Sequence, residues 1–457
     1  MDRQKQLGEE NVKKLLLKFS VPAIMGMLVN ALYNIVDRMY IGHIKNVGSL
    51  AITGVGLTLP IMTVLMAFSM LIGIGSASII SIRLGQQRKK DAEKILGNAF
   101  TLLCIIMITI TIIGLIFVSP LLNIFGASKQ TFYYAKEYIV IILIGSITNA
   151  LGFGLNNSIR AEGNPKMAMV TMLLGAVLNI ILDPIFIFVF NMGIKGAAIA
   201  TVISQTANTL WVLRYFTGRT STLKLRKRNF KVEKKIFLEI VSIGMAPFAL
   251  QLAASVVTII SNNALKTTGG DLAIGAMTVI NSIALIFLMP IFGINQGAQP
   301  IIGYNYGASK YKRVKETLKI AIICATIIVV IGSLVVQVFP QYIIRIFNND
   351  PKLMEIGISG LRVVLFMMPI IGFQIVSSNY FQAIGKAKIS VVLSLLRQVI
   401  ILIPLLLILP RHFGLKGVWL CTPIADGIAS IVTAIFILRE MKKLGREDLK
   451  EPKVACE

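Results

Sequence analysis

The sequence predicts an all-α integral membrane protein of about twelve transmembrane helices, arranged as two pseudo-symmetric six-helix bundles around a central cavity. Of its 457 residues, 55% are hydrophobic and 15% are charged, and the mean hydropathy is +0.78. These values lie outside the range of soluble domains. Apolar stretches of roughly 20 residues, enough to cross a bilayer, recur along the chain. The predicted spans are residues 18–42, 51–82, 95–118, 132–159, 166–190, 197–218, 236–262, 272–303, 314–339, 355–383, 389–410 and 417–440.

The positive charge is distributed unevenly between the two ends of these spans. The net charge is +25, and 34 of the 46 Lys and Arg residues lie in the two tails and in alternate connections. The positive-inside rule therefore predicts that both termini are cytoplasmic and that the protein is a multi-pass protein of the cell (plasma or inner) membrane. Such residues commonly contact anionic headgroups, so the bilayer, and not a nucleic acid, is the expected partner of this charge.

Segments separated by about 222 positions resemble each other, which predicts an internal repeat. Gly75 and Gly85 correspond to Gly297 and Gly307, residues 160–166 to residues 382–388, and residues 193–196 to residues 414–417. Each half holds six predicted spans, an even number, so both halves enter the membrane in the same sense. The predicted organisation is an N-terminal lobe at residues 1–218, a basic cytoplasmic linker at residues 219–235 and a C-terminal lobe at residues 236–457.

Asp37 lies well inside the first predicted span. A carboxylate at membrane depth costs several kcal/mol on insertion scales unless it has a partner, a water-filled cavity or a function. Helical spacings of four and three place Asn30, Asn34 and Asp37 on one face, with Tyr33 beside them. This stripe is a candidate polar site in the N-terminal lobe.

The fifth span carries a second pair of the same kind. Asn179 and Asp183 are four residues apart, and Pro184 predicts a kink directly after them. Ligands that are all oxygens suit a hard ion such as Na⁺, whereas the same buried carboxylates can instead carry protons, because burial disfavours their charged form. The alternative is a structural role, with both acids neutralised by local hydrogen bonds or by Arg38.

The internal repeat separates fold from function at these positions. Asp37 corresponds approximately to Asn262, and Asp183-Pro184 corresponds to Ile403-Pro404. The proline is therefore attributed to the fold, and the acids, present in the N-terminal half only, to ion chemistry. The ion expected in this half is a coupling ion, either Na⁺ or a proton.

Other ionisable residues carry weaker signals. Arg397 is expected either to pair with a carboxylate or to extend to the headgroups, and Asp426 either to pack between helices or to take part in function. Glu239 lies near the start of a span. Nucleotide-binding and hydrolase motifs are absent from the sequence. The expectation is therefore a secondary transporter, not an enzyme, with no cofactor other than a coupling ion.

Several segments together resemble the multidrug and toxic compound extrusion (MATE) family of antiporters. The resemblance covers nearly the whole chain and implies export of small organic, often cationic and amphipathic compounds in exchange for Na⁺ or H⁺, with no nucleic-acid partner, by an expected monomer. It rests on residues 36–42, 83–85, 160–165, 179–184, 193–201, 296–300 and 305–307.

The resemblance also implies roles for single residues. It assigns cation coupling to Asp37, Asn179, Asp183 and Thr201, with Tyr33, Asn34, Tyr138 and Asn156 as neighbouring polar groups. Other branches of the family couple through acids in helices 7 and 10. This sequence differs from those branches, because its tenth span offers only the neutral polar residues Gln374, Ser377, Ser378 and Asn379.

A lipid or lipid-linked oligosaccharide flippase of related fold is the alternative function. A protein that handles pyrophosphate should carry several basic side chains within its cavity helices. Here Arg38 and Arg397 are the basic residues assigned to the interior of spans, and the others are counted with the span ends and connections, which favours the antiporter.

Overall fold

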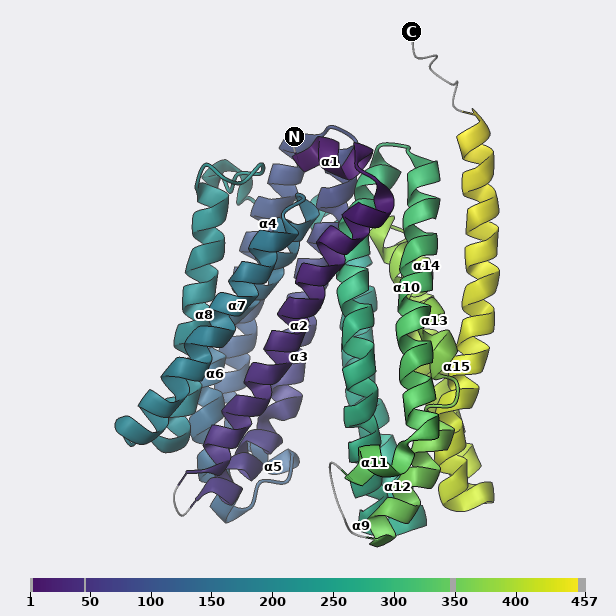
Figure 1. The fold of residues 1–457 in the computed structure, drawn as a ribbon. Helices are drawn as coiled ribbons and strands as arrows, with labels where there is room; N and C mark the ends of the chain where they lie inside the picture. Colours follow the sequence, from purple (N-terminus) through teal and green to yellow (C-terminus); the bar gives the residue numbers. More distant parts are fainter. Residues whose placement is uncertain (1–2, 45–46, 346–350, 451–457) are drawn as a thin grey trace. The chain divides into compact units, whose positions relative to one another are not determined.

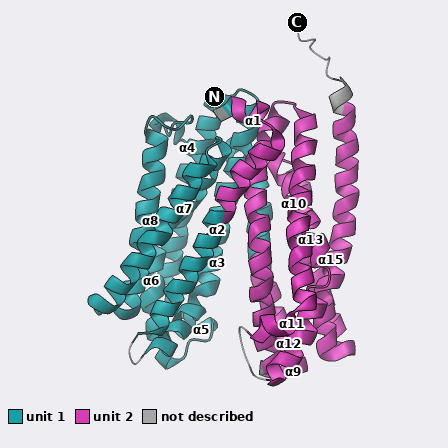
Figure 2. Ribbon diagram, in the orientation of Figure 1, with its two compact units in different colours: residues 1–4, 25–251 teal, residues 5–24, 252–457 magenta. Residues whose placement is uncertain are grey.

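The computed structural model describes residues 3–44, 47–345 and 351–450, and the secondary structure of these ranges is helical, without strands (Figure 1). The terminal residues 1–2 and 451–457, whose cytoplasmic placement is predicted above, lie outside the described residues. The chain divides into two compact units (Figure 2). Unit 1 is built on residues 25–251, and unit 2 on residues 5–24 and 252–450.

Unit 1 holds the helices of the first repeat. The segment after Met25 of α2 and the first part of α9 belong to it. Within it α3 packs against α4 and α6, and α6 packs against α8. Its elements are α2 (Val12–Gly42), α3 (Gly48–Gly85), α4 (Lys89–Ile116), α5 (Val118–Ile124), α6 (Lys129–Ala161), α7 (Pro165–Pro184), the π-helix η1 (Ile185–Val189), α8 (Gly193–Thr217), the 3₁₀-helix η2 (Lys227–Asn229) and the start of α9 (Lys234–Gly307).

Unit 2 holds the helices of the second repeat together with the N-terminal segment at residues 5–24. Within it α10 packs against α13, and α13 packs against α15. Its elements are most of α1 (Arg3–Glu9), the start of α2, the second part of α9, α10 (Tyr311–Val338), α11 (Pro340–Arg345), α12 (Pro351–Val364), α13 (Met368–Ala383), α14 (Ala387–Leu395), the π-helix η3 (Leu396–Leu402) and α15 (Ile403–Lys450).

All twelve predicted spans fall on helices, but fewer separate helices are long and apolar enough to cross a membrane. Among the described residues nine helices are long and apolar enough to cross a membrane, or ten if α12 and α13, bent by 51°, form one span. Residues 387–446 form one of these nine. The backbone at Gly414 is not helical, however, and divides this stretch into two arms. Helix α8 is not among the nine, because polar residues such as Gln205 and Asn208 interrupt its apolar sequence.

The backbone repeats as the sequence does. Gly163 and Gly385, 222 positions apart, both have positive φ (96° and 78°), and each ends a helix one or two residues before the next begins. In unit 1 this turn is completed by Asn164, whose side chain accepts from the Met167 amide, and by Pro165 at the first turn of α7. The two glycines explain why residues 160–166 and 382–388 match, since both turns need a left-handed residue at the same place.

The irregularity predicted at Pro184 takes the form of a π-helical turn. Helix α7 ends at Pro184, and η1 follows directly. In unit 2, η3 stands immediately before Ile403 and Pro404. Proline cannot donate a backbone hydrogen bond, and a wider turn beside it is a common way for a helix to continue. The proline and its wide turn thus occur in both halves, whereas the acid occurs in one.

Glycines allow close helix crossings in each unit. In unit 1 a Cβ atom added at Gly73 of α3 would lie 2.6 Å from Cα of Gly154 in α6, and one added at Gly244 of α9 would collide with the carbonyl oxygen of Leu71 in α3. In unit 2 a Cβ atom at Gly297 of α9 would lie 2.7 Å from the backbone nitrogen of Ser20 in α2. Small residues at such crossings let two backbones approach, which is the main source of helix packing in lipid.

The basic linker is fixed to unit 1. The Asn98 amide group of α4 donates to the carbonyl oxygens of Asn229 (3.2 Å) and Lys231 (3.1 Å), and Asn98 Oδ1 accepts from the Glu233 amide (2.8 Å). Glu93 on the same helix pairs with Arg226 at 3.1 Å. The linker therefore positions the start of α9 on unit 1, although its sequence is polar and has no apolar period.

The crossing of α3 and α9 gives a prediction about stability. Gly244→Ala should destabilise the protein by about 1–3 kcal/mol, because the methyl group meets a backbone oxygen that cannot move aside. Thermal unfolding of the purified protein in detergent measures the effect. Gly56→Ala is the matched control, since an added Cβ there has no neighbour within 4 Å. Equal melting temperatures for the two variants would contradict this description of the crossing.

Candidate cation site

Asp37 of α2 and Asp183 of α7 are brought together within unit 1. Both are buried, with 8% and 0% of their surface exposed, and their carboxyl groups lie close enough to interact. Earlier in α2, Gly26 leaves room for the Met172 side chain of α7, since an added Cβ would lie 2.9 Å from its Sδ. Asp37 Oδ1 and Asp183 Oδ2 have no hydrogen-bond partner among the described residues.

Asn179 connects this pair to α8. Its side-chain amide donates to Asp183 Oδ1 at 3.1 Å and to Thr201 Oγ1 at 3.3 Å. The first bond follows from the four-residue spacing on α7, and the second from the packing of α7 against α8. With its NH₂ group directed at these two oxygens, Asn179 has a buried Oδ1 that finds no donor in the described chain.

Of three further polar residues in the prediction, Tyr33 and Tyr138 lie near this group, and Asn156 bonds to another part of α7. Tyr33 and Tyr138 are close enough to Asp37 and Asp183 to interact electrostatically with the two carboxyl groups, and Tyr138 is buried. Asn156 is also buried, and its amide group donates to the carbonyl oxygen of Ala168 at 2.9 Å. Its contact is thus with the first turns of α7, and no hydrogen bond among the described residues connects it to the carboxylates.

Asn34 and Arg38 are placed differently. The Asn34 side chain is exposed and donates to the carbonyl oxygen (2.7 Å) and to Oδ1 (3.2 Å) of Asn30, one turn earlier. It contributes no bond to Asp37. Arg38 is exposed and attracts the Asp37 carboxylate through charge, without a hydrogen bond. Arg38 therefore does not supply the direct neutralising partner that a structural role would need.

The electrostatics of this group require a positive partner. Two carboxylates in contact repel strongly where the dielectric constant is low, and each unsatisfied buried acceptor costs about 1–3 kcal/mol. The atoms that lack a donor in the described chain, on Asp37, Asp183 and Asn179, are all oxygens. An oxygen-only set of this kind can hold a hard cation or a proton.

Two acids that the sequence assigns to the C-terminal half, Asp426 and Glu239, differ from this group in having cationic partners. Arg397 in η3 donates from Nε to Asp426 Oδ1 of α15, and Asp426 is only 1% exposed. This contact decides between the two roles expected for Arg397 in favour of pairing. Glu239 accepts from Arg83 at 3.1 Å within unit 1. Gln374, Ser377 and Ser378 of α13 are buried, and they supply no charge.

Three buried acids, Glu93, Glu162 and Glu440, are not singled out by the sequence analysis, and Glu162 is the most deeply buried of them. Glu162 is 0% exposed, and its Oε2 accepts from Ser221 Oγ (2.8 Å) and from the Leu223 amide (3.0 Å). Tyr215 also donates to Oε1. The counterpart of Glu162 in the second half is Ile384, so the criterion applied to Asp37 and Asp183, an acid in one half only, identifies Glu162 as well.

Comparisons with known proteins show which family and fold the chain resembles. The family model MatE matches residues 22–185 and 236–408. Multidrug export protein MepA of Staphylococcus haemolyticus (strain JCSC1435) is 30% identical over 434 residues, with 95% of each chain covered. The protein of the same name from Staphylococcus aureus (strain MSSA476) is 28% identical and covers 96% of this chain and 97% of its own.

Solved structures are similar over the same length. A multidrug resistance MATE family transporter of the MOP superfamily, in an outward-facing conformation, has a TM-score of 0.89 and 27% identity, covering 96% of this chain and 98% of its own. A MATE protein in a bent conformation has a TM-score of 0.91 and 26% identity, covering 98% and 99%.

The buried ion pair of unit 2 gives a second prediction. Asp426→Ala should lower the free energy of unfolding by about 3 kcal/mol, because it leaves the Arg397 guanidinium without its partner. The double variant Arg397→Met, Asp426→Leu should recover most of that loss, since it removes both charges and keeps the volume. Thermal unfolding in detergent measures both. A double variant no more stable than Asp426→Ala would show that the pair itself is not what stabilises this part of unit 2.

Proposed function

Because the chain belongs to the MatE family, we propose that it exports organic, amphipathic and often cationic compounds across the plasma membrane in exchange for an inward-moving sodium ion or proton. Relatives that cover nearly its whole length bear the name multidrug export protein. One observation on this chain supports the exchange most strongly. Buried oxygens of Asp37, Asp183 and Asn179 converge in unit 1 without donors among the described residues.

The residues of this group have separate roles in the proposal. Asp37 and Asp183 carry the negative charge that attracts the ion, and Thr201 Oγ1 adds an uncharged oxygen. Asn179 orients Asp183 and Thr201 through its amide group and offers Oδ1 to the ion. Tyr33 and Tyr138 add aromatic rings and hydroxyl groups near the carboxylates, whereas Asn156 bonds to the start of α7 and has no direct role in this proposal.

Coupling follows from the position of Asp37 on α2. An ion that bridges Asp37 and Asp183 ties α2 to α7, so its arrival bends α2 and lowers the affinity for the compound being exported. The ion-loaded, empty carrier then turns inward, releases the ion and takes up the next compound. In this scheme the ion and the compound are bound alternately.

The energy of one ion is sufficient for this exchange. One charge that moves inward across 100 mV yields about 2.3 kcal/mol, enough for a gradient of roughly fifty-fold in an uncharged compound. A monovalent cationic compound exchanged one for one cancels the electrical part, and the ion's concentration gradient then drives export.

A flippase function is less well supported. Pyrophosphate would need several unpaired basic side chains within the spans, but Arg397 is bonded to Asp426. The relatives above are named for multidrug export.

The distribution of Lys and Arg favours cytoplasmic termini. The proposed site is complete within one chain, which is consistent with a monomer.

The proposal predicts that Asp37→Asn and Asp183→Asn each reduce ethidium export by about ten-fold or more, since a contact to a charged group is worth about 1.5–3 kcal/mol. Export is measured in membrane vesicles, with a sodium gradient and a pH gradient imposed separately. The gradient that drives the unmodified protein identifies the coupling ion.

Glu137→Gln is the matched control. It also removes one carboxylate from unit 1, but Glu137 pairs with Lys195 at 2.7 Å and lies outside the group. It should export at the unmodified rate. Normal export by both Asp variants under either gradient would refute the coupling site.

A further inference from the structure

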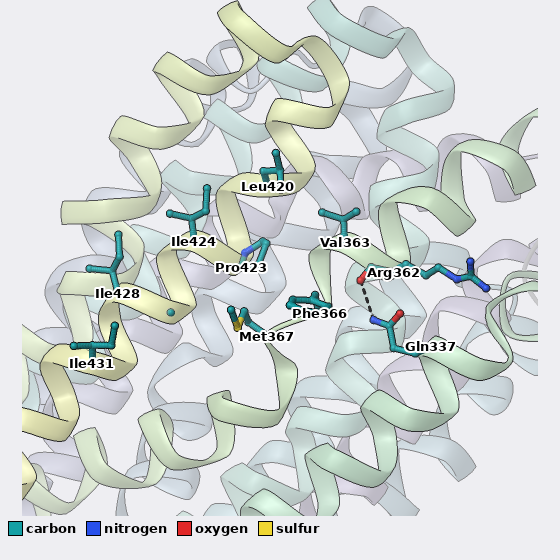
Figure 3. Close-up of a pocket in the computed structure, with 11 residues that line it drawn as sticks. Gln337, Arg362, Val363, Phe366, Met367, Leu420, Pro423, Ile424, Ile428 and Ile431 are labelled. Carbon is teal, nitrogen blue, oxygen red and sulfur yellow. Dashed lines mark hydrogen bonds between the residues drawn. The ribbon is translucent and has the colours of Figure 1, made fainter.

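Unit 2 contains a groove that the proposed transport function does not use. It lies between α10, α12 and α15 and has a volume of about 650 Å³ (Figure 3). Val363, Phe366, Leu420, Ile424, Ile428 and Ile431 form its apolar walls. Gln337 and Arg362 are its polar lining residues. Its volume is typical of sites that hold small molecules.

The groove follows from two irregularities of the helices around it. The chain leaves helical geometry between α12 and α13, which meet at 51°, and Phe366 in this break is 63% exposed. On the opposite wall, Gly427 of α15 has no side chain, and a Cβ added there would have no neighbour within 4 Å. The bend and the missing side chain together leave the space between α12 and α15 unfilled.

The apolar wall has the length of one leaflet of a bilayer. Leu420, Ile424, Ile428 and Ile431 follow each other at spacings of four, four and three on α15, so they form one stripe. From the first to the last, the helix rises about 16 Å. The hydrocarbon core is about 30 Å thick, so the stripe matches the depth that a single acyl chain occupies.

The other end of the groove is polar and positive. Gln337, one residue before the end of α10, donates to the carbonyl oxygen of Arg362 at 2.9 Å. Figure 3 shows the Arg362 guanidinium beyond Gln337, on the side away from Ile428 and Ile431. Arg362 is exposed, and within the described ranges of the chain its guanidinium has no carboxylate partner. A cation thus stands at the end of α10, where the membrane interface is expected.

We propose that this groove binds a phospholipid with an anionic headgroup, whose phosphate contacts Arg362 and whose acyl chain lies along Ile424, Ile428 and Ile431. A guanidinium matches a phosphate in geometry and charge, and the stripe matches the chain in length. A headgroup with net negative charge is attracted, whereas the ammonium group of a zwitterionic lipid offsets that attraction. With cytoplasmic termini, as proposed above, this lipid belongs to the outer leaflet.

The fluorescence of Trp419 can report binding of this lipid. Trp419 is the neighbour of Leu420, is 2% exposed, and lies against α12, where a Cβ added at Gly360 would be 3.0 Å from its Cε2. The chain has two tryptophans, so Trp211→Phe leaves Trp419 alone. Phospholipids with brominated acyl chains quench tryptophan fluorescence at short range, and they report occupation of the groove without any transport measurement.

The experiment compares brominated phosphatidylglycerol with brominated phosphatidylcholine, each added to full-length Trp211→Phe protein in phosphatidylcholine bilayers. Phosphatidylglycerol should reach half-maximal quenching at about a five-fold lower mole fraction, the ratio that roughly 1 kcal/mol per basic residue gives. Arg362→Gln should remove this preference. Gly427→Leu, which fills the groove, should reduce quenching by both lipids.

Arg411→Gln is the matched control, because it removes an exposed charge of α15 that does not line the groove. It should keep the preference. Melting temperatures measured in phosphatidylcholine identify any variant that is misfolded. Equal quenching by the two lipids, or an equal loss of preference in Arg362→Gln and Arg411→Gln, would overturn the proposal. Failure of ethidium export would leave it untouched, because binding is measured without a gradient.

Discussion

The proposed function of unit 1 depends on buried oxygens that lack donors among the described residues. Asp37 and Asp183 interact within the membrane part of the chain, and Asn179 directs its NH₂ group to Asp183 and Thr201, so that its own oxygen is left over. Burying a hydrogen-bond acceptor without a partner costs free energy, and burying an unpaired charge costs more. A visiting cation or proton is the partner that we propose for this arrangement.

The contrast between the two units separates fold from ion chemistry. Both use a left-handed glycine turn, at Gly163 and Gly385, and both place a proline beside a π-helical turn. These features shape the helices irrespective of charge. Asp426 is buried in unit 2 and bonds through Oδ1 to the Arg397 guanidinium, although its Oδ2 has no hydrogen-bond partner among the described residues. An acid with a fixed partner stabilises, whereas an acid without one is available to an ion.

The sequence is informative where the determinants are local. Hydropathy and turn residues locate the helices and the repeat, and the four-residue spacing brings Asn179 to Asp183. Contacts between distant segments are not predictable in this way. The pairing of Arg397 with Asp426, the attachment of the linker to Asn98 and the burial of Glu162 all depend on tertiary packing. Asn34 shows the limit of helical spacing, because it shares a broad face with Asp37 and yet bonds to Asn30.

The most direct test of the central claim is infrared difference spectroscopy of the carboxyl groups in the purified protein. Acidification in the absence of sodium should produce an absorption band of protonated, buried carboxyl groups, and a rise in pH or addition of sodium should remove it. Both changes should be missing when Asp37 and Asp183 are replaced by asparagine together. A spectrum that neither pH nor sodium alters, with both carboxylates permanently ionised, would contradict the account.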